Sequence, residues 1–196
     1  KNPGFYAELE NHPNVIHLAV HPSAPYDDCI FNEHNPTEND DRTNYYGIYG
    51  GTPKLVIQGE FKDGANFSNP NLYAAYEGKT TSFSILITQQ LKTVDSIEVI
   101  VDITKEDTST LTSAHLYGVL AEAEIGYDAP NGESTHHDVL RKSLFGSAGE
   151  SVTLPTVLNE TKSYTALVRK HSDWNMTEMY AMAILQDGAS QKVIQA

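Results

Sequence analysis

The spacing of hydrophobic residues changes near residue 80. In the stretch SIEVIVDIT, residues 96–104, every second residue is Ile or Val and the residues between them are mostly polar. Because successive side chains of a strand point to opposite faces, this period of two predicts a half-buried β-strand. Similar patterns predict strands at residues 83–91, 115–125, 139–145, 163–170, 179–186 and 192–195. Polar turns separate them, so residues 80–196 are predicted to form an antiparallel β-sandwich.

Before residue 80, helical and strand patterns alternate. Phe5 and Leu9 lie four residues apart with glutamates on the other side, which predicts a short amphipathic helix over residues 5–10. The stretch VIHLAV, residues 15–20, is nearly all apolar, as is typical of a strand covered on both faces in a parallel sheet.

Two Asn-Pro pairs predict the starts of further helices. Asn35 is expected to cap a helix that begins at Pro36 and ends near Tyr46. Asn69 followed by proline predicts a third helix over residues 70–77 in the same way.

A strand is predicted at residues 55–57, followed by a hairpin through Gly59 and a turn at residues 62–64. The order helix, strand, helix, strand, strand, helix is typical of a mixed α/β layer. We therefore expect two domains, residues 1–79 and residues 80–196, with the boundary near residues 78–81.

Charge and cysteine content narrow the classes of function. The formal net charge of −13 argues against nucleic acid as a partner, because phosphate binding relies on Lys and Arg. A protein or peptide partner remains open, as does the oligomeric state. No apolar stretch reaches the length of a transmembrane segment, and no signal-peptide core precedes Asn2, so any export signal is expected to have been removed. The single cysteine excludes a disulfide-stapled scaffold.

Two long parts of the sequence resemble a known protein family. Residues 1–60, with FNEHNPTENDDRTNYYG at 31–47 as the most specific part, resemble the thioredoxin-like half of the 28-kDa outer-membrane-protein-related family of Bacteroidetes-type bacteria. Residues 134–196, with HHDVLRKSLFG at 136–146, resemble the immunoglobulin-like half of that family. The resemblance implies a thioredoxin-like α/β domain followed by an immunoglobulin-like β-sandwich. It also implies export to the periplasm, the outer membrane or the cell exterior, without a defined reaction and without a cofactor.

The sequence departs from that family at its start. In relatives, a strand and a Cys-x-x-Cys motif precede the position of Asn2 and Pro3, and this chain contains neither. The leading hypothesis is therefore an exported protein with a binding or assembly role that is non-catalytic as the chain stands. The alternative is a thiol-disulfide oxidoreductase or isomerase whose Cys-x-x-Cys lies upstream of Lys1.

Thr52 and Pro53 are the predicted substrate-binding residues. In the thioredoxin architecture the proline after this turn is cis, and the resemblance implies that the pair would form the wall of a site for an extended substrate. The other interpretation is a turn that only joins a helix to a strand.

A second alternative function is metal binding by the loop of residues 21–34. No recognised ligand spacing occurs there, so no metal site is predicted. Cys29, the only thiol, is interpreted as a free or buried cysteine or as one that pairs outside this chain. In the alternative, the ligands would be His21, Asp27, Asp28, Cys29, Glu33 and His34.

Two further groups of residues invite functional interpretations. His136 and His137 are expected just before a strand, and because neighbours on a strand diverge, they are not expected to share a metal. Trp174, with Tyr164 and Tyr180, could line a ligand groove, although aromatic residues at strand ends usually pack against the core.

Overall fold

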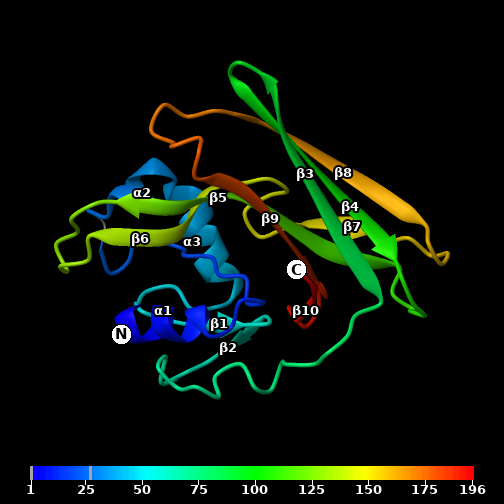
Figure 1. Cartoon of the computed structure of the whole chain (residues 1–196), viewed down its shortest axis with the longest axis horizontal. Coiled ribbons are helices and arrows are strands. Elements are labelled where there is room, and N and C mark those ends of the chain that lie inside the picture. Colours follow the sequence, from blue (N-terminus) through cyan, green and yellow to red (C-terminus); the bar gives the residue numbers. More distant parts are fainter. Residues whose placement is uncertain (1, 27) are drawn as a thin grey trace.

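The computed structural model of the protein describes residues 2–26 and 28–196, with side chains from residue 4 onward. The architecture is dominated by antiparallel β-sheets with few helices. The helices, α1 (Asn2–Glu10), α2 (Ile30–His34) and α3 (Pro36–Tyr45), all lie in the first quarter of the chain. Figure 1 shows them gathered beside one sheet of a β-sandwich, on the side away from the other sheet.

The sandwich consists of a five-stranded and a three-stranded sheet. The larger sheet has the order β10 (Val193–Gln195), β9 (Met179–Gln186), β5 (Ser113–Gly126), β6 (Thr135–Ser143), and β7 (Glu150–Thr153) also pairs with β5. The smaller sheet has the order β3 (Phe83–Thr93), β4 (Ser96–Lys105), β8 (Thr161–Arg169). All of these pairings are antiparallel, which confirms the predicted strand type.

Burial along β4 follows the predicted period of two. Ile97, Val99, Val101 and Ile103 are buried, and the residues between them are only partly buried. These side chains pack against residues of the larger sheet such as Leu116 and form the core between the sheets. The alternating sequence pattern thus predicts a strand correctly where one face of the strand packs on the core and the other is exposed to solvent.

The larger sheet is covered on both faces. In β5, residues 116–122 are all buried, because the N-terminal part of the chain packs on the face that points away from the smaller sheet. Leu18 and Val20 pack there against Tyr117 and Val119. α2 and α3 pack against β6 of the same sheet.

A buried arginine joins α3 to this face. Arg42 is 3% exposed, and its guanidinium carbon lies 3.7 Å from the ring centroid of Tyr117. Its Nη2 donates hydrogen bonds to Tyr46 Oη at 2.7 Å and to Gln186 Oε1 at 2.9 Å. The guanidinium of Arg42 is therefore held by a cation–π interaction with Tyr117, which is stronger away from water, and by packing of its side chain.

Several predictions for the N-terminal part are wrong. Residues 15–20 are extended but form only one parallel bridge, Ala19 with Val139 of β6, instead of a strand within a parallel sheet. Residues 70–77 form successive turns instead of a helix. There the side chain of Asn69 accepts a hydrogen bond from the amide of Asn71, which stabilises a local turn in competition with a helix start.

Residues 36–45 form the helix expected after Asn35, but Asn35 does not cap it. The side-chain amide nitrogen Nδ2 of Asn35 instead donates to Glu38 Oε2 at 2.6 Å and to the carbonyl oxygen of Arg141 at 3.2 Å. This side chain therefore ties the helix to β6.

The predicted hairpin forms, with its turn at Gln58 and Gly59 between β1 (Val56–Ile57) and β2 (Glu60–Phe61). Gly59 has a φ of 85°, and a Cβ at this position would lie 2.0 Å from the carbonyl oxygen of Gln191, so the turn requires glycine. These short strands form a sheet of their own. The division at residues 79 and 80 stays a prediction.

Candidate functional site: a basic groove beside the outer strand of the small sheet

A hollow of about 400 Å³ is lined by residues of β6 and β8, which are edge strands of the two sheets of the sandwich. It is bounded by α2, the end of β6, the end of β8 and the loop of residues 170–178. An adjoining hollow shares Arg169, His171 and Trp174 with it, and we call the two together the basic groove. The basic groove is lined by His34, Asn35, Arg141, Lys142, Ser143, Leu144, Leu167, Val168, Arg169, His171, Trp174, Val94, Asp95, Lys170, Ser172 and Met176.

A buried ion pair forms the base of the groove. Arg141 Nε donates to Glu122 Oε2 at 2.7 Å, and each side chain is 4% exposed. The pair bridges neighbouring strands, because Arg141 lies on β6 and Glu122 on β5. The guanidinium also lies 5.7 Å from the ring centroid of Phe31 on α2.

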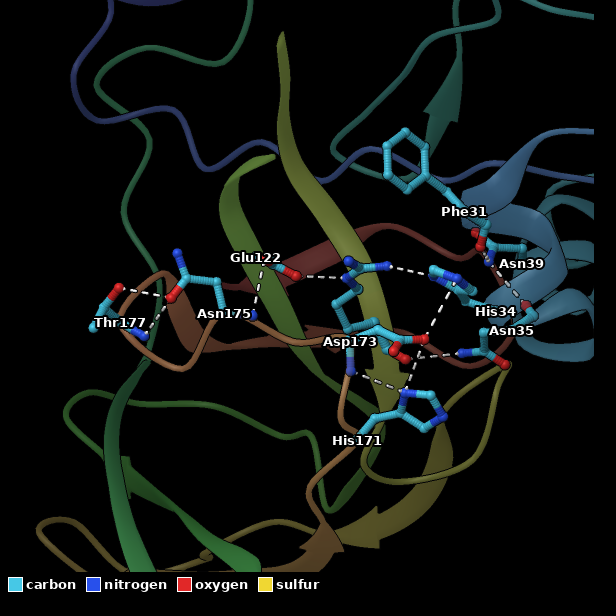
Figure 2. Close-up of polar contacts among 10 residues, drawn as sticks. Phe31, His34, Asn35, Asn39, Glu122, His171, Asp173, Asn175 and Thr177 are labelled. Atoms are coloured by element: carbon cyan, nitrogen blue, oxygen red, sulfur yellow. Dashed lines mark hydrogen bonds and ion pairs between the residues drawn. The ribbon is translucent and has the colours of Figure 1, made fainter. Parts of the chain in front are cut away.

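The hydrogen bonds of Arg141 determine the state of His34. Arg141 Nη1 lies 3.1 Å from His34 Nδ1, and because a guanidinium can only donate, this nitrogen of His34 is the acceptor. The proton of the neutral ring is then on Nε2, which faces Asp173 Oδ2 at 3.6 Å. The same carboxylate oxygen lies 3.4 Å from His171 Nδ1. Figure 2 shows the line of contacts that runs from Glu122 to His171 across the groove.

The loop of residues 170–178 is fixed to this line of contacts. The amide of Asn175 donates to Glu122 Oε1 at 3.1 Å, so both oxygens of that carboxylate are engaged. The Asn175 side chain accepts from the amide and the hydroxyl of Thr177, which closes a tight turn (Figure 2). Trp174 is thereby held at the wall shared by both hollows. Of the three aromatic residues that the sequence suggested for a groove, only Trp174 lines this one.

The positive charges of the groove differ in what they contact. Lys142 pairs with Glu38, and Lys170 Nζ donates to the carbonyl oxygen of Val94 at 2.9 Å. Arg169 is exposed and has no acidic partner among the residues that the structure describes. The groove thus presents a free guanidinium and a half-buried indole on a strongly acidic protein.

The predicted substrate-binding residues lie outside the basic groove. Thr52 and Pro53 are exposed in a turn before β1, and the peptide bond between them is cis, as is the bond between Ala24 and Pro25. Whether they contact a substrate stays a prediction.

The candidate metal ligands are not brought together. His21 Nδ1 lies 3.7 Å from Cys29 Sγ, whereas His34 turns away to Arg141 and Glu33 is exposed. Asp27 lies outside the described residues, and Asp28 is exposed. In residues 2–26 and 28–196, no three His, Cys, Asp or Glu side chains form a group suited to a metal ion.

His21 is nevertheless in an unusual environment. Its ring lies 4.8 Å from that of Phe31 and 6.3 Å from that of His136. Burial, together with the charges of His136 and Arg141, lowers the pKa of His21 to about 4. The ring is therefore neutral near pH 7.

A second polar cluster lies where residues 15–20 meet β6. His17 Nδ1 is 2.9 Å from Asp138 Oδ2, and Tyr180 donates its hydroxyl to Asp138 Oδ1 at 2.5 Å. Burial alone would raise the pKa of Asp138, but the hydrogen bonds from His17 and Tyr180 outweigh it and hold that pKa below its usual value. This cluster is a packed junction between the N-terminal part and the sheet.

His136 and His137 lie within β6, not before it as the sequence suggested. Their rings have different neighbours, as expected for adjacent strand residues: His136 packs against Phe31 and His137 against Tyr6.

The pair of Glu122 and Arg141 was not predicted from the sequence. Its signal was the presence of charged residues inside mostly apolar strand segments, VLRKSLF at residues 139–145 and VLAEAEI at residues 119–125. A charge at such a position is almost never buried unless it is paired, so each predicts a partner on a neighbouring strand.

Comparisons with known proteins agree with the fold. No protein-family model and no curated protein match the sequence. Among solved structures, HBP35 of Porphyromonas gingivalis is similar, with a TM-score of 0.64 and 12% identity. The alignment covers 84% of this chain and 58% of HBP35, so the chain spans little more than half of that protein. At this identity the likeness shows a shared fold.

A domain of the outer membrane lipoprotein Omp28 from Porphyromonas gingivalis is more distant. Its TM-score is 0.39 at 17% identity, over 61% of this chain and 87% of that domain. A TM-score this low does not establish a shared fold.

Proposed function

We propose that the protein is an exported cell-envelope or extracellular protein that binds a partner in the basic groove and is non-catalytic as this chain stands. The observation that carries the proposal is the composition of the groove. It combines Arg169, which has no acidic partner among the described residues, with Trp174, on a molecule of net charge −13. Arginine and tryptophan are the residue types that dominate binding energy in protein interfaces.

Two features make the groove suited to binding. The buried pair of Glu122 and Arg141 fixes its base, and the contacts of Asp173 and Asn175 fix its wall. A rigid site loses less conformational entropy when a partner binds. The one thiol of the described chain, Cys29, lies next to His21 and does not line the groove.

The envelope location rests on the resemblance of residues 1–60 and 134–196 to the outer-membrane-protein-related family. In the described residues, no helix has the length and apolar character needed to cross a bilayer. The same resemblance supports a thioredoxin-like interpretation of residues 1–79 and an immunoglobulin-like interpretation of residues 80–196.

A second candidate function is thiol-disulfide exchange. It is favoured by the exposed turn of Thr52 and Pro53, which is open to an extended substrate. It requires a Cys-x-x-Cys upstream of Lys1. A gene that encodes no cysteine pair within about ten residues upstream, roughly three helical turns, would end this candidate.

Site-specific photo-crosslinking tests the leading proposal. Leu167 in the groove and Leu86 on β3 are both 65% exposed and belong to the same sheet, so they form a matched pair. A photoreactive residue is placed at one position or the other, in cells that export the protein. We expect a defined crosslinked species in the envelope or extracellular fraction from position 167 and none from position 86. Absence of crosslinks from position 167, or equal crosslinks from both, would contradict the proposal.

A further inference from the structure

β8 is one of the two outer strands of the small sheet, and among the described residues one of its edges is unpaired. β8 pairs with β4 along its whole length, and no strand in the described part of the chain pairs with its other side. The amide of Lys170 donates to the carbonyl of Asp95, and the amide of Lys105 donates to the carbonyl of Glu160. Because hydrogen-bonded and non-bonded pairs alternate in an antiparallel ladder, the even-numbered residues of β8 direct their backbone groups to β4.

It follows that the odd-numbered residues of β8 direct their backbone N–H and C=O groups away from the sheet. These residues are Thr161, Ser163, Thr165, Leu167 and Arg169, and their side chains are exposed as well. No backbone hydrogen bond to them from outside the ladder occurs among the described residues. An edge of this kind is a ready template for another strand.

The other strand that borders the groove is closed by contrast. On β6, the amide of Ser143 donates to Glu38 Oε2 at 2.6 Å, and the carbonyl of Arg141 accepts from Asn35 at 3.2 Å. The start of α3 thus covers the edge of β6 and leaves that of β8 open. The contrast locates the available backbone groups on one wall of the groove.

The charge at the end of β8 selects the kind of strand that could pair there. Arg169 lies at the open edge without an acidic partner among the described residues, beside Lys170. A parallel pairing of two copies of β8 would place Arg169 beside Arg169, which disfavours that arrangement of the protein with itself at this edge. An acidic strand is complementary to it.

We propose that the basic groove binds an extended acidic segment of a partner protein, which adds to the small sheet as a strand beside β8. The inference rests on the proposed function and names the chemistry of the partner. Backbone hydrogen bonds to Thr165, Leu167 and Arg169 supply affinity, and a carboxylate of the segment faces the free guanidinium of Arg169. A free anion would use the cations but not the open backbone edge.

The test uses the single tryptophan of the chain as a reporter. Trp174 fluorescence is followed while a capped heptapeptide of alternating Glu and Thr is added, with calorimetry as a second readout. The matched control peptide has Lys in place of Glu, and inorganic phosphate and free glutamate serve as small anions. We expect saturable binding of the Glu peptide and at least about tenfold weaker binding of the Lys peptide and of both anions.

Protein variants separate the backbone contribution from the side chain. Leu167→Pro removes an amide that makes no bond within the sheet, whereas Leu167→Ala keeps it, and proline is tolerated on an edge strand. We expect Leu167→Pro and Arg169→Glu to weaken peptide binding by about tenfold or more, and Leu167→Ala by less than about threefold.

Modified peptides give a readout that does not depend on folding of a variant. Because alternate amides of a strand point to opposite edges, N-methylation of the Glu amides or of the Thr amides should abolish binding in one case and preserve it in the other. The inference would be overturned if the two methylated peptides bound equally well. It would also be overturned if the Lys peptide or phosphate alone bound as tightly as the Glu peptide. If the crosslink at position 167 persists while the Glu peptide fails to bind, this inference fails and the proposed function stands. If both fail, both are wrong.

Discussion

Removing Arg141 should expose how far the groove depends on its buried ion pair. Arg141→Met leaves the carboxylate of Glu122 buried, with the amide of Asn175 as its remaining donor. Breaking a buried pair by removing one partner costs about 3–5 kcal/mol of unfolding free energy. For a protein of this size, that corresponds to a fall in melting temperature of roughly 6–20 °C.

The double variant Arg141→Met, Glu122→Leu should be much less harmful. It removes both charges, so no uncompensated carboxylate remains, and the apolar replacements fill a similar volume. A residual cost of about 1–3 kcal/mol is expected, because the amide of Asn175 loses its acceptor. The contrast between the single and the double variant is therefore the diagnostic quantity.

The assay is urea denaturation of the wild type, both single variants and the double variant, which closes a double-mutant cycle. Lys92→Met is the control, because Lys92 pairs with Glu98 at 2.8 Å but is 54% exposed. Its midpoint should remain within error of the wild type, since exposed pairs contribute little. A loss in Arg141→Met no larger than that of the control would refute the claim that this pair is buried and organises the groove.

Three further outcomes are expected. Burial lowers the pKa of His21 from 6.5 to about 4, so between these values the unfolded chain binds a proton that the folded chain does not. The free energy of unfolding should therefore fall by up to about 3 kcal/mol as the pH drops from 6.5 to 4, and His21→Gln should flatten this slope in denaturation curves. Arg42→Lys should lower the melting temperature measurably, because an ammonium cannot stack flat on Tyr117 while donating to Gln186; a melting temperature equal to that of the wild type would contradict the stacking. The chain should reduce insulin disulfides no faster than a free monothiol does. A faster rate in a turbidity assay would contradict the proposal that the chain is non-catalytic.

The sandwich could be predicted from sequence because its strands mostly meet core on one face and solvent on the other. β4 is the clearest case, with every second residue buried. β5 shows where the period breaks down, since the N-terminal part covers its second face and residues 116–122 are all buried. β7 was missed because it has only four residues, of which Val152 alone is buried.

The errors in the N-terminal part arise where packing against the rest of the chain, and not the local sequence, decides the structure. Asn-Pro pairs satisfy a helix start and a turn almost equally well, and the surroundings decide between them. After Pro36 the helix packs on β6, whereas residues 70–77 remain a chain of turns. The apolar residues 15–20 indicated a place between two layers, and they do pack on a sheet, but with a single bridge to Val139.

The groove was beyond sequence reasoning because it is assembled from distant parts of the chain. Arg141, His34 and Asp173 are separated by long stretches, and only the packing of α2 and the 170–178 loop around β6 brings them together. Trp174 was expected to pack against the core, as it does, with a groove as the alternative, and its partners in the groove were not predicted. The charged residues at buried strand positions were the one local sign of the site.

Amide hydrogen exchange along β8 tests the central claim most directly. The outward amides of Thr165, Leu167 and Arg169 should exchange rapidly in the free protein and slowly when the Glu peptide is bound. The even-numbered residues of β8, which already bond to β4, should be protected in both states. Selective protection of the outward amides is the result that the account predicts. Binding of the peptide with no change at these three amides would contradict it.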